Sequence, residues 1–381
     1  MKQLIVLGIT GSIACVRAFD LCRSLRRKGF EVQVILSKAA AGMITEQAME
    51  FASGSPVITE ITGKIEHVKF FGKNGKAKLL LIAPSTANTI SKIAMGIDDT
   101  PVTTFATVAI GSKKPVLLAP AMHKPMYEHP IVLENLQKLE VHGVKIVSPL
   151  EEEGKAKMQS IDEIVFEIEK ALMEQKLKGK KILVAYGAFQ EKIDDVRVIT
   201  NNSSGKMGCT IAAELMKQNA DVKVFGNGAR ESYFDFTEIK EADVLEHATL
   251  KELEKNYDYF ICPAALPDFY SKAKKGKIKS GKIIALELIP KEKLIEKVVK
   301  KFPKLKVIAF KAEHGKNKKE LEALAKAMAK SKKLFGVIAT NLSKNPVGKD
   351  ESEMFICFAK KQKWTKGSKK EIAEEITKNL K

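Results

Sequence analysis

The stretch QLIVLGITGSIACVRAFDLCRSLRRKGFEVQVILS, residues 3–37, contains the pattern that predicts the fold. Residues 3–9 are almost all apolar, as in a strand that is buried on both faces, and a tight turn follows them. Residues 13–29 have the periodicity of an amphipathic helix that ends at Gly29, and residues 31–37 form a second buried strand. Strand, helix and strand in this order predict a βαβ unit with a right-handed crossover, and therefore a parallel sheet.

Further buried strands are predicted along the rest of the chain. In the first half they lie at 77–84, 114–120 and 144–149. A fresh strand at 181–187 restarts the pattern, which continues at 221–227, 257–265, 305–313 and 335–341. The predicted fold class is α/β, with two doubly wound, parallel-sheet, Rossmann-like domains at residues 1–175 and 181–381 and a Lys- and Gly-containing linker between them. Ligands of such sheets bind beyond the carboxyl ends of the strands.

The composition is that of a basic globular protein. The 381 residues carry 65 Lys and Arg against 46 Asp and Glu, a net charge of +19, which makes nucleic acid an alternative partner. The lysines are spread along the chain, however, and aromatic residues make up only 7%, with Trp364 the single tryptophan. No basic and aromatic binding strip is therefore predicted, and anionic small substrates with a Lys- and Glu-rich surface account for the charge.

Cysteine usage and apolar runs exclude other classes of protein. The five cysteines are odd in number and show no C-x-x-C spacing, so neither a disulfide framework nor a zinc site is predicted. The first apolar run, residues 4–9, is too short for a membrane span and lacks the features of a signal peptide. We expect a cytoplasmic protein without a membrane partner.

The segment NNSSGKMG, residues 201–208, opens a predicted helix of the second half. Free backbone N–H groups and the positive end of a helix attract phosphate at such a position. A P-loop would need Gly at 200 and Ser or Thr at 207, where the chain has Thr200 and Met207. The residues predict either another kind of phosphate site or an ordinary Gly- and Ser-rich loop.

Three motifs of the first half also follow predicted strands. They are GITGSIA at 8–14, APSTANTISKIAMGIDD at 83–99 and PAMHKPMYEHP at 120–130. The first is not G-x-G-x-x-G, which favours a mononucleotide over a dinucleotide. His67 precedes the third strand, and a lone histidine by itself fits either a structural role or a proton carrier.

Together these motifs resemble those of the homo-oligomeric flavin-containing cysteine decarboxylases. The resemblance implies a flavoprotein fold, FMN as cofactor and His67 as catalytic base. The residues that it places on FMN are Gly11, Ser12, Ile13, Ser37, Ser85, Thr86, Asn88, Asp98 and Met122. Met126 and His123 belong to the implied substrate loop, in which His123 stands where the family has Asn and could still donate a hydrogen bond to a carboxylate.

The implied flap over this site departs from the bacterial members of the family. Those members carry a cysteine that protonates the decarboxylated intermediate, whereas residues 151–158 read EEEGKAKM without a cysteine. The EEGKAK form resembles the archaeal branch. Lys155, Lys157 and His123 are the candidates for the catalytic proton donor.

The run IDDVRVITNNSSGKMG, residues 193–208, resembles the signature of phosphopantothenate cysteine ligase, which is commonly fused behind the decarboxylase. The whole chain therefore resembles the bifunctional enzymes of coenzyme A biosynthesis. The residues implied to hold the triphosphate of CTP are Ser203, Ser204 and Gly205. Asn201 is implied to handle the acyl-cytidylate, Lys206 either contacts phosphate or faces water, and Lys277 in GKIKS is the expected cation for the transferring phosphate.

Other segments of the second half fit the same ligase family. The residues that they place at the nucleotide are Ala264, Ala265, Asp268, Phe310 and Asn341, with Lys332 or Lys333 facing its phosphates. Asp268 is also the expected ligand of Mg²⁺. The segment IPKEK at 289–293 lacks the family's Asn, and GAF at 187–189 replaces its Gly-x-Thr, which leaves the choice between CTP and ATP open.

The resemblance implies an enzyme that is both a ligase and a carboxy-lyase. CTP-dependent ligation would join cysteine to 4'-phosphopantothenate through an acyl-cytidylate, and FMN-dependent decarboxylation would convert the product to 4'-phosphopantetheine. The family also implies a homo-oligomer, a trimer or dodecamer through the first domain and a dimer through the second. Two alternatives stay open: an active ligase whose other half binds FMN without complete turnover, and a basic nucleic-acid-binding protein.

Overall fold

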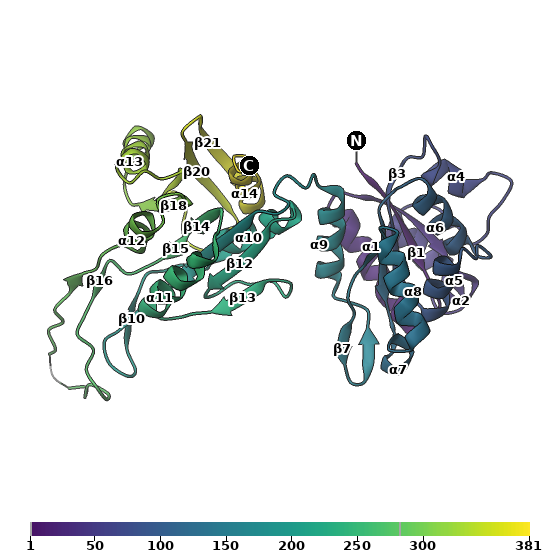
Figure 1. Ribbon diagram of the computed structural model, residues 1–381, viewed down its shortest axis with the longest axis horizontal. Helices are drawn as coiled ribbons and strands as arrows, with labels where there is room; N and C mark the ends of the chain where they lie inside the picture. The colour runs from purple at the N-terminus through teal and green to yellow at the C-terminus, as the bar shows by residue number, and fades with distance from the viewer. Residues whose placement is uncertain (1, 282) are drawn as a thin grey trace. The chain divides into compact units, whose positions relative to one another are not determined.

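The computed structural model describes residues 2–281 and 283–381, and the chain divides into two compact units, 1–173 and 174–381 (Figure 1). Each unit has a parallel sheet with helices on its faces, which confirms the predicted α/β class. No helix in the described part of the chain is both long and apolar enough to cross a membrane.

The first unit is built on a five-stranded parallel sheet of order β2-β1-β3-β4-β6. Its strands are β1 (Leu4–Ile9), β2 (Glu31–Leu36), β3 (Ala77–Ser85), β4 (Val116–Pro120) and β6 (Lys145–Ile146). Successive side chains of β1 enter different cores, because strand side chains alternate between the two faces: Ile5 and Leu7 pack in one cluster and Val6 in the other. A strand buried on both faces reads as a continuous apolar run, as predicted.

Helices cover both faces of this sheet. They are α1 (Ala18–Arg27), α3 (Glu46–Ser53) and α9 (Ile161–Leu172) on one face, and α4 (Glu66–Phe71), α5 (Ala87–Met95), α6 (Pro101–Gly111) and α8 (Pro130–Val141) around the other. Shorter helices follow the strand ends: η1 (Ile13–Arg17), α2 (Lys38–Ala41) and α7 (Lys124–Tyr127). The helix predicted at 13–29 is thus split into η1 and α1. In α1, Leu21, Cys22 and Leu25 are buried, while Arg23 and Arg26 are exposed.

The second unit has a nine-stranded sheet of order β13-β12-β9-β14-β18-β19-β20-β21, in which β15 also pairs with β9. The parallel strands are β9 (Lys181–Ala188), β12 (Asp221–Gly226), β13 (Asp235–Glu238), β14 (Tyr259–Cys262), β15 (Ala264–Ala265), β18 (Lys306–Glu313) and β19 (Gly336–Asn341). Two antiparallel strands extend it: β20 (Glu351–Phe358) and β21 (Lys361–Ser368). The sheet is therefore mixed, and the sequence did not predict this last pair.

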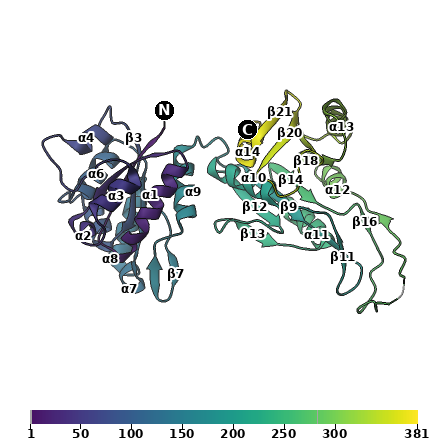
Figure 2. The ribbon, with the colours of Figure 1, turned by 180° about the vertical axis from the view of Figure 1, so that it is seen from behind.

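The helices of the second unit pack around this sheet, and two short ribbons project beyond it (Figures 1 and 2). The helices are α10 (Lys206–Lys217), α11 (Ala242–Glu252), η2 (Leu253–Lys255), α12 (Leu294–Lys301), α13 (Lys318–Ser331) and α14 (Lys369–Thr377). The ribbons pair β10 (Gln190–Lys192) with β11 (Val198–Thr200), and β16 (Phe269–Tyr270) with β17 (Ile289–Pro290). Both ribbons carry or flank motifs that the sequence analysis singled out.

Candidate active sites

The turns after β1, β3 and β4 are joined at the carboxyl edge of the first sheet. Thr10 Oγ1 donates a 2.8 Å hydrogen bond to Pro84 O and accepts one of 3.1 Å from Thr86 N. Ser12 Oγ donates to Ala121 O at 3.1 Å. These contacts bring GITGSIA, APSTAN and the 120–130 loop together, which is where ligands of such sheets bind.

The turn after β2 completes this edge. Ser37 N donates to Ile9 O at 3.0 Å, and Ser37 Oγ accepts the N–H of Ala40 at 3.2 Å, which leaves its own O–H to donate. A Cβ on Gly11 would lie 2.5 Å from Cβ of Ala39, so a glycine is required where these two turns meet. The predicted cofactor residues Gly11, Ser12 and Ser37 are therefore neighbours.

The hydroxyl of Ser85 gives independent support for a ligand at this edge. Ser85 is 0% exposed, and its Oγ is buried without a hydrogen-bond partner in the described part of the protein. Leaving such a group unpaired costs about 1–3 kcal/mol. Thr86 beside it caps α5 by accepting the N–H of Thr89 at 3.3 Å. Hydroxyls, backbone N–H groups and a glycine-lined turn are the donors that a phosphate needs, so these residues fit a phosphorylated cofactor such as FMN.

The remaining residues predicted for this site are mostly exposed. Among the predicted cofactor residues, Ile13 is 78% exposed, Asn88 and Asp98 are exposed and Met122 is half-buried, while the predicted substrate residue Met126 is 49% exposed. Single exposed apolar side chains are ordinary, but here they border a predicted site.

The predicted flap is an antiparallel ribbon of order β5-β8-β7. Its strands are β5 (Met122–His123), β8 (Lys155–Lys157) and β7 (Leu150–Glu152). Glu153 and Gly154 have φ of 52° and 67°, as in the two-residue type I′ turn that suits a hairpin. His123 is registered opposite Lys155, so the two side chains share one face of the ribbon.

The candidate proton donors of this ribbon have different surroundings. Lys157 Nζ is paired with Glu153 at 2.9 Å and Glu152 at 3.3 Å, and the hydrogen bond that Lys157 donates to Glu153 raises the pKa of Lys157. A lysine with a raised pKa gives up its proton less readily. Lys155 is on the same strand, β8, and both Lys155 and His123, which lies opposite it on β5, are exposed.

His67 does not join the carboxyl edge within one chain. It is half-buried on α4, its ring centroid lies 6.5 Å from that of Phe105, and its Nδ1 is buried without a hydrogen-bond partner in the described structure. Figures 1 and 2 show α4 at the end of the first unit away from α7 and β7. The structure therefore separates this predicted base from the predicted FMN residues of the same copy.

In the second unit the motif NNSSGKMG lies at the carboxyl edge of the sheet, against two other turns. Asn201 Nδ2 donates to Leu266 O at 2.8 Å, which connects it to the segment PAALPDF. Ala229 N donates to Ser204 O at 3.4 Å, and Asn227 Nδ2 donates to Ala188 O at 2.9 Å. The structure thus brings Asn201, Ser204 and the Ala264–Ala265 segment together as predicted neighbours of a nucleotide.

Glycines allow α10 to start directly on β9. Gly205 is the residue before α10 and has a φ of 72°. A Cβ on Gly208 would lie 2.2 Å from Cβ of Tyr186 in β9, so a glycine is required for the first turn of α10 to pack this closely on the strand. The N–H groups of this first turn point away from the helix body, where Ser203 and Ser204 flank them, and such an arrangement suits a phosphate.

Lys206 has a partner that the sequence did not predict. Its Nζ donates to Asp350 Oδ1 at 2.8 Å and to Gly348 O at 3.1 Å. The Lys206 ammonium lowers the pKa of Asp350. Lys206 is exposed, as one of the two alternatives expected, and it contacts the loop before β20 through this ion pair.

The other predicted nucleotide residues lie at different edges of the second sheet. Lys332 and Lys333 follow α13 and precede β19, at the amino edge of the sheet, and Lys332 Nζ pairs with Glu296 at 2.5 Å. The structure does not bring these two lysines to the edge that holds NNSSGKMG, because a loop before a parallel strand lies opposite to the loop after it. Asn341 ends β19 at the carboxyl edge, where its Oδ1 accepts the N–H of Ser343 at 3.0 Å and its Nδ2 donates to Lys316 O. Phe310 lies half-buried within β18.

Asp268 and Lys277 are both exposed. The Asp268 side chain is 63% exposed and its Oδ1 lies 3.4 Å from Lys293 Nζ. In the described residues no group of three or more His, Cys, Asp or Glu side chains is arranged to hold a metal, so a Mg²⁺ here would need ligands from the nucleotide phosphates. Lys277 lies in the segment between β16 and β17.

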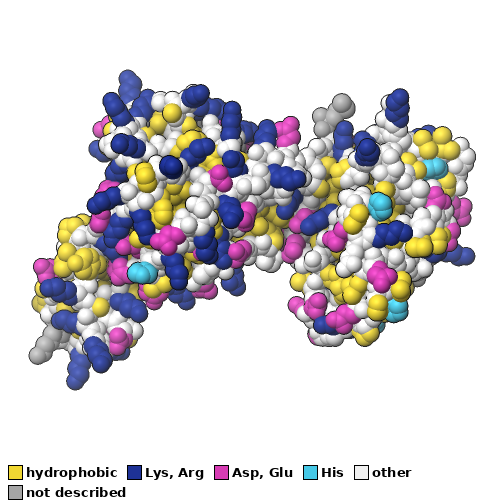
Figure 3. All heavy atoms as spheres, viewed as in Figure 1, with side chains coloured by type: hydrophobic (Ala, Val, Ile, Leu, Met, Phe, Trp, Pro, Cys, Tyr) yellow, Lys and Arg dark blue, Asp and Glu magenta, His cyan; other side chains and the backbone are white. Residues whose placement is uncertain are grey.

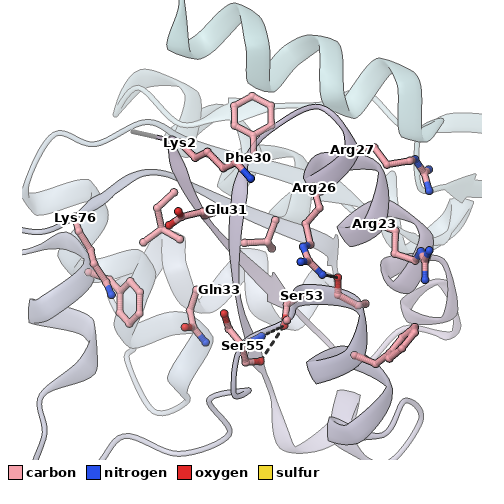
Figure 4. A pocket seen from close by; sticks show the side chains of 16 residues that line it. Lys2, Arg23, Arg26, Arg27, Phe30, Glu31, Gln33, Ser53, Ser55 and Lys76 are labelled. Atoms are coloured by element: carbon pink, nitrogen blue, oxygen red, sulfur yellow. Dashed lines mark hydrogen bonds between the residues drawn. The ribbon is translucent and has the colours of Figure 1, made fainter.

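A hollow of about 670 Å³ lies at the opposite, amino edge of the first sheet (Figure 4). It is lined by Leu4 and Glu31 at the starts of β1 and β2, and by Arg23, Arg26 and Arg27 of α1. Basic side chains near a helix carboxyl end are favoured by the helix dipole alone. None of the predicted site residues lines this hollow.

On the face shown in Figure 3, the charge of the described residues forms no footprint for nucleic acid. In Figure 3, Lys and Arg side chains are spread over the visible face, with carboxylates between them. Many of the lysines are in surface ion pairs, such as Lys223 with Asp235 at 2.6 Å and Lys301 with Glu254 at 2.7 Å. A nucleic-acid interface would instead gather unpaired cations along one groove or face.

The folds together define a two-unit α/β protein, and in each unit the predicted phosphate-binding motif lies at the carboxyl edge of the sheet. Residues 1–173 match the family model described as Flavoprotein, and residues 177–381 match the one described as DNA/pantothenate metabolism flavoprotein C-terminal domain. The chain is 44% identical over 380 residues to the coenzyme A biosynthesis bifunctional protein CoaBC of Thermococcus kodakarensis, covering 98% of this chain and 93% of that relative. It is 36% identical over 387 residues to the CoaBC protein of Methanocaldococcus jannaschii, covering 100% and 94%.

Among solved structures, the DNA/pantothenate metabolism flavoprotein from Streptococcus pneumoniae is 21% identical, with a TM-score of 0.47, covering 53% of this chain and 98% of that chain. The full-length matches to the relatives identify the family: the chain belongs to the bifunctional coenzyme A biosynthesis proteins, CoaBC. The family predicted from the motifs is thereby confirmed, and the similarity to the Thermococcus protein agrees with the archaeal-like flap.

Proposed function

We propose that the chain carries out two successive reactions of coenzyme A biosynthesis. The second unit ligates cysteine to 4'-phosphopantothenate at the expense of CTP, and the first unit decarboxylates the product to 4'-phosphopantetheine. The observation that carries this proposal is that each unit has its own strand edge with phosphate-type donors and its own set of family motifs. Each of the two proposed reactions therefore has its own candidate site.

In the first unit, Ser12, Ser37 and Thr86 would hold the phosphate of FMN, with Gly11 leaving room for its close approach. When bound, FMN accepts a hydride from the substrate and returns it, which makes loss of carbon dioxide easier. His123 donates a hydrogen bond to the substrate carboxylate and so orients it. His123 or Lys155 delivers the proton that replaces the carboxylate, in place of the cysteine of bacterial flaps.

His67 acts as the base from a second copy of the chain. Its position on α4, away from the FMN residues of its own copy, supports this arrangement, as do the exposed Ile13 and Met126 that border the edge. Covering those apolar side chains with another copy would stabilise an oligomer. The unpartnered Nδ1 of His67 then gains a hydrogen-bond partner at the contact.

In the second unit, the first turn of α10 with Ser203 and Ser204 binds the triphosphate of CTP. The carboxylate of 4'-phosphopantothenate attacks the α-phosphate, pyrophosphate leaves, and the cysteine amine then displaces CMP to form the amide. Asn201, fixed by its bond to Leu266 O, holds the acyl-cytidylate, and Lys277 neutralises charge on the transferring phosphate. Asp268 would be the residue that holds a Mg²⁺, which would supply positive charge for the phosphates.

The test is mass spectrometry of the products that purified protein forms from 4'-phosphopantothenate, cysteine, CTP and magnesium, with FMN supplied. We expect 4'-phosphopantetheine and carbon dioxide. Accumulation of phosphopantothenoylcysteine alone would reject the decarboxylase half and support the alternative in which FMN is bound without turnover. If neither product forms and the protein instead shifts arbitrary duplex with steep salt dependence, the proposal is wrong and nucleic-acid binding takes its place.

A further inference from the structure

We propose that the turn Asp194–Arg197 binds the backbone on both sides of Lys277 through hydrogen bonds and so positions this lysine for nucleotidyl transfer. We call this turn the clamp. The inference deepens the proposed ligase function and rests on it. The turn lies between β10 and β11, about 80 residues from Lys277 in the sequence. It supplies positioning residues, because none of its side chains is required to touch the reacting atoms.

Four hydrogen bonds join residues 193–197 to residues 274–278, three of them from the turn itself and one from the adjacent Ile193. Asp195 Oδ2 accepts the N–H of Gly276 at 2.9 Å, and Asp194 Oδ2 accepts the N–H of Ile278 at 3.0 Å. The residue between these two N–H groups is Lys277. Outside this pair, Arg197 Nη1 donates to Ile278 O at 3.1 Å and Lys274 N donates to Ile193 O at 2.9 Å.

Asp194 is built to stay ionised and fixed. It is 2% exposed, and its Oδ1 accepts the N–H groups of Val196 at 2.8 Å and Arg197 at 2.6 Å, while its Oδ2 also accepts from the Arg197 guanidinium. Burial alone would favour the neutral acid, but the backbone N–H groups of Ile278, Val196 and Arg197 together with the guanidinium hold the pKa of Asp194 well below its usual range. A carboxylate with this many donors is a rigid anchor.

The clamped segment needs such an anchor because of its own composition. Residues 272–279 contain five lysines, and the structure has neither helix nor strand over the described residues 271–281. Like charges at this density repel one another and extend a chain that has no other structure. The adjacent carboxylates of Asp194 and Asp195 offset this repulsion. Because they accept the N–H groups of Gly276 and Ile278, Lys277 is the one of the five lysines whose backbone they hold on both sides.

The clamp is also close in the chain to the phosphate site. Strand β11 (Val198–Thr200) begins directly after Arg197 and ends directly before Asn201. Its register with β10 and the 2.8 Å bond from Thr200 Oγ1 to Phe189 O fix both ends of this strand. The cation that neutralises phosphate and the loop that binds phosphate are therefore held by one short, paired segment. This explains why the ligase signature begins at Asp194, several residues before NNSSGKMG.

A hairpin turn that merely closes β10 and β11 would have different properties. Asn at 194 could still accept the N–H groups of Val196 and Arg197, because an Asx turn needs only one oxygen. It could not also accept the N–H of Ile278 with the strength of a carboxylate. The variant Asp194→Asn therefore separates the two roles, and Asp195→Asn tests the Gly276 contact without touching the buried acid.

The first measurement is hydrogen exchange of the full-length protein, read by mass spectrometry over peptides that span 274–280. Exchange there should be roughly 10- to 100-fold faster in Asp194→Asn and in Asp195→Asn, the loss expected when a hydrogen bond to a charged acceptor is removed. Asp235→Asn, which removes only a surface ion pair with Lys223, is the matched control and should leave exchange in this segment unchanged. Unchanged exchange in both clamp variants would overturn the proposal.

The second measurement is a double-mutant cycle on the ligase reaction. Asp194→Asn should lower kcat roughly 10- to 100-fold, with KM for 4'-phosphopantothenate within about twofold of the parent. If the turn acts through the lysine, Asp194→Asn combined with Lys277→Gln is no slower than Lys277→Gln alone. Losses that multiply would show that the turn acts otherwise and would sink the inference.

The two measurements also distinguish this inference from the proposed function. If Lys277→Gln is fully active, the assigned role of Lys277 fails. Faster hydrogen exchange in the clamp variants would then still show that the turn protects the N–H groups of residues 274–280. If the parent shows no ligation with CTP, the proposed function fails at once. Thermal unfolding of each variant, compared with Asp235→Asn, identifies any that lose activity because the second unit has unfolded.

Discussion

The two phosphate-type edges of the molecule are built in opposite ways. The first edge is assembled from hydroxyls and backbone groups that are bonded to one another, such as Thr10 with Pro84 and Ser12 with Ala121. The second edge combines the first turn of a twelve-residue helix, α10, with a lysine on a clamped, otherwise irregular segment. The first edge therefore presents uncharged groups that are already hydrogen-bonded in place, whereas the second edge is accompanied by a lysine, Lys277, on an irregular segment.

Under the proposed function, in which the first edge holds FMN and the second holds CTP, this difference follows from the task of each edge. A cofactor that stays bound through many turnovers is best held by groups that are already in place, since no ordering is needed at binding. A triphosphate that is bound, cleaved and released in every cycle gains from a cation that acts on the charge developing during transfer. The comparison predicts that the two halves respond differently to changes in charge, packing and salt.

The largest effect is expected from removing the cation. Lys277→Gln should lower kcat of ligation by about 10²- to 10³-fold, the range for loss of one group that stabilises transition-state charge. The matched variant Lys206→Gln should change kcat by less than about tenfold, because Lys206 is occupied by Asp350. Steady-state ligation assays compare the two, with decarboxylation of supplied phosphopantothenoylcysteine as an internal control. Equal losses in both variants would contradict this division of roles.

The next effect concerns the close approach of α10 to β9. Gly208→Ala places a Cβ 2.2 Å from Cβ of Tyr186, far inside van der Waals contact, and the resulting shift should destabilise the second unit by about 2–3 kcal/mol. Thermal or urea unfolding measures the loss, and ligation should fall with it. Gly29→Ala is a useful comparison, since a Cβ there has nothing within 4 Å but φ is +94°, so its smaller cost reports backbone strain alone.

A smaller effect should come from salt. Raising KCl from about 50 to 500 mM should increase KM for CTP by roughly 3- to 10-fold, because the exposed Lys277 is screened. Retention of FMN, followed by flavin absorbance after gel filtration, should stay unchanged, because the first edge presents hydroxyls and backbone groups. A parallel loss of flavin would show that the first edge depends on charge after all.

The smallest expected effect is that of thiol alkylation. All five cysteines are buried, and burial raises the pKa of Cys22 to about 11 and, with Glu231 nearby, that of Cys209 to about 11. Because a raised pKa keeps the thiol protonated at pH 8, iodoacetamide should label the native protein little and leave decarboxylation intact. Intact-mass spectrometry counts the labels. Rapid inactivation with a single label would point to a catalytic cysteine after all.

Local pattern explains most of what the sequence predicted correctly. Apolar runs such as 4–9 and 181–187 became β1 and β9, because central parallel strands are buried on both faces. Glycines and hydroxyls that directly follow such strands identified both edges, since strand ends and helix starts are determined by neighbouring residues. Strand β21 was missed because Lys361–Ser368 is mostly polar and lacks that apolar run, whereas β20 ends in the buried run MFICF, which the sequence analysis did not assign.

Contacts between distant segments could not be predicted in this way. The pairing of Lys206 with Asp350 spans 144 residues, and the bond from Asp194 to Ile278 spans 84. Lys332 illustrates the opposite case: family position suggested a phosphate contact, but the topology places it before β19 and beside Glu296. Single-sequence patterns fix which residues form an element, whereas side-chain partners depend on how the elements are brought together.

The β5-β8-β7 ribbon carries both proposed proton donors, His123 and Lys155, on paired strands, so its motion affects both of them. Because His123 belongs to the loop after β4 and Lys155 to the hairpin paired with it, any motion that lifts the hairpin from β5 also separates these two side chains. Under the proposed function, a product that leaves past a lifted ribbon does so when His123 and Lys155 are no longer held opposite each other. Proton delivery from the ribbon would then belong to the state in which β5 and β8 are paired.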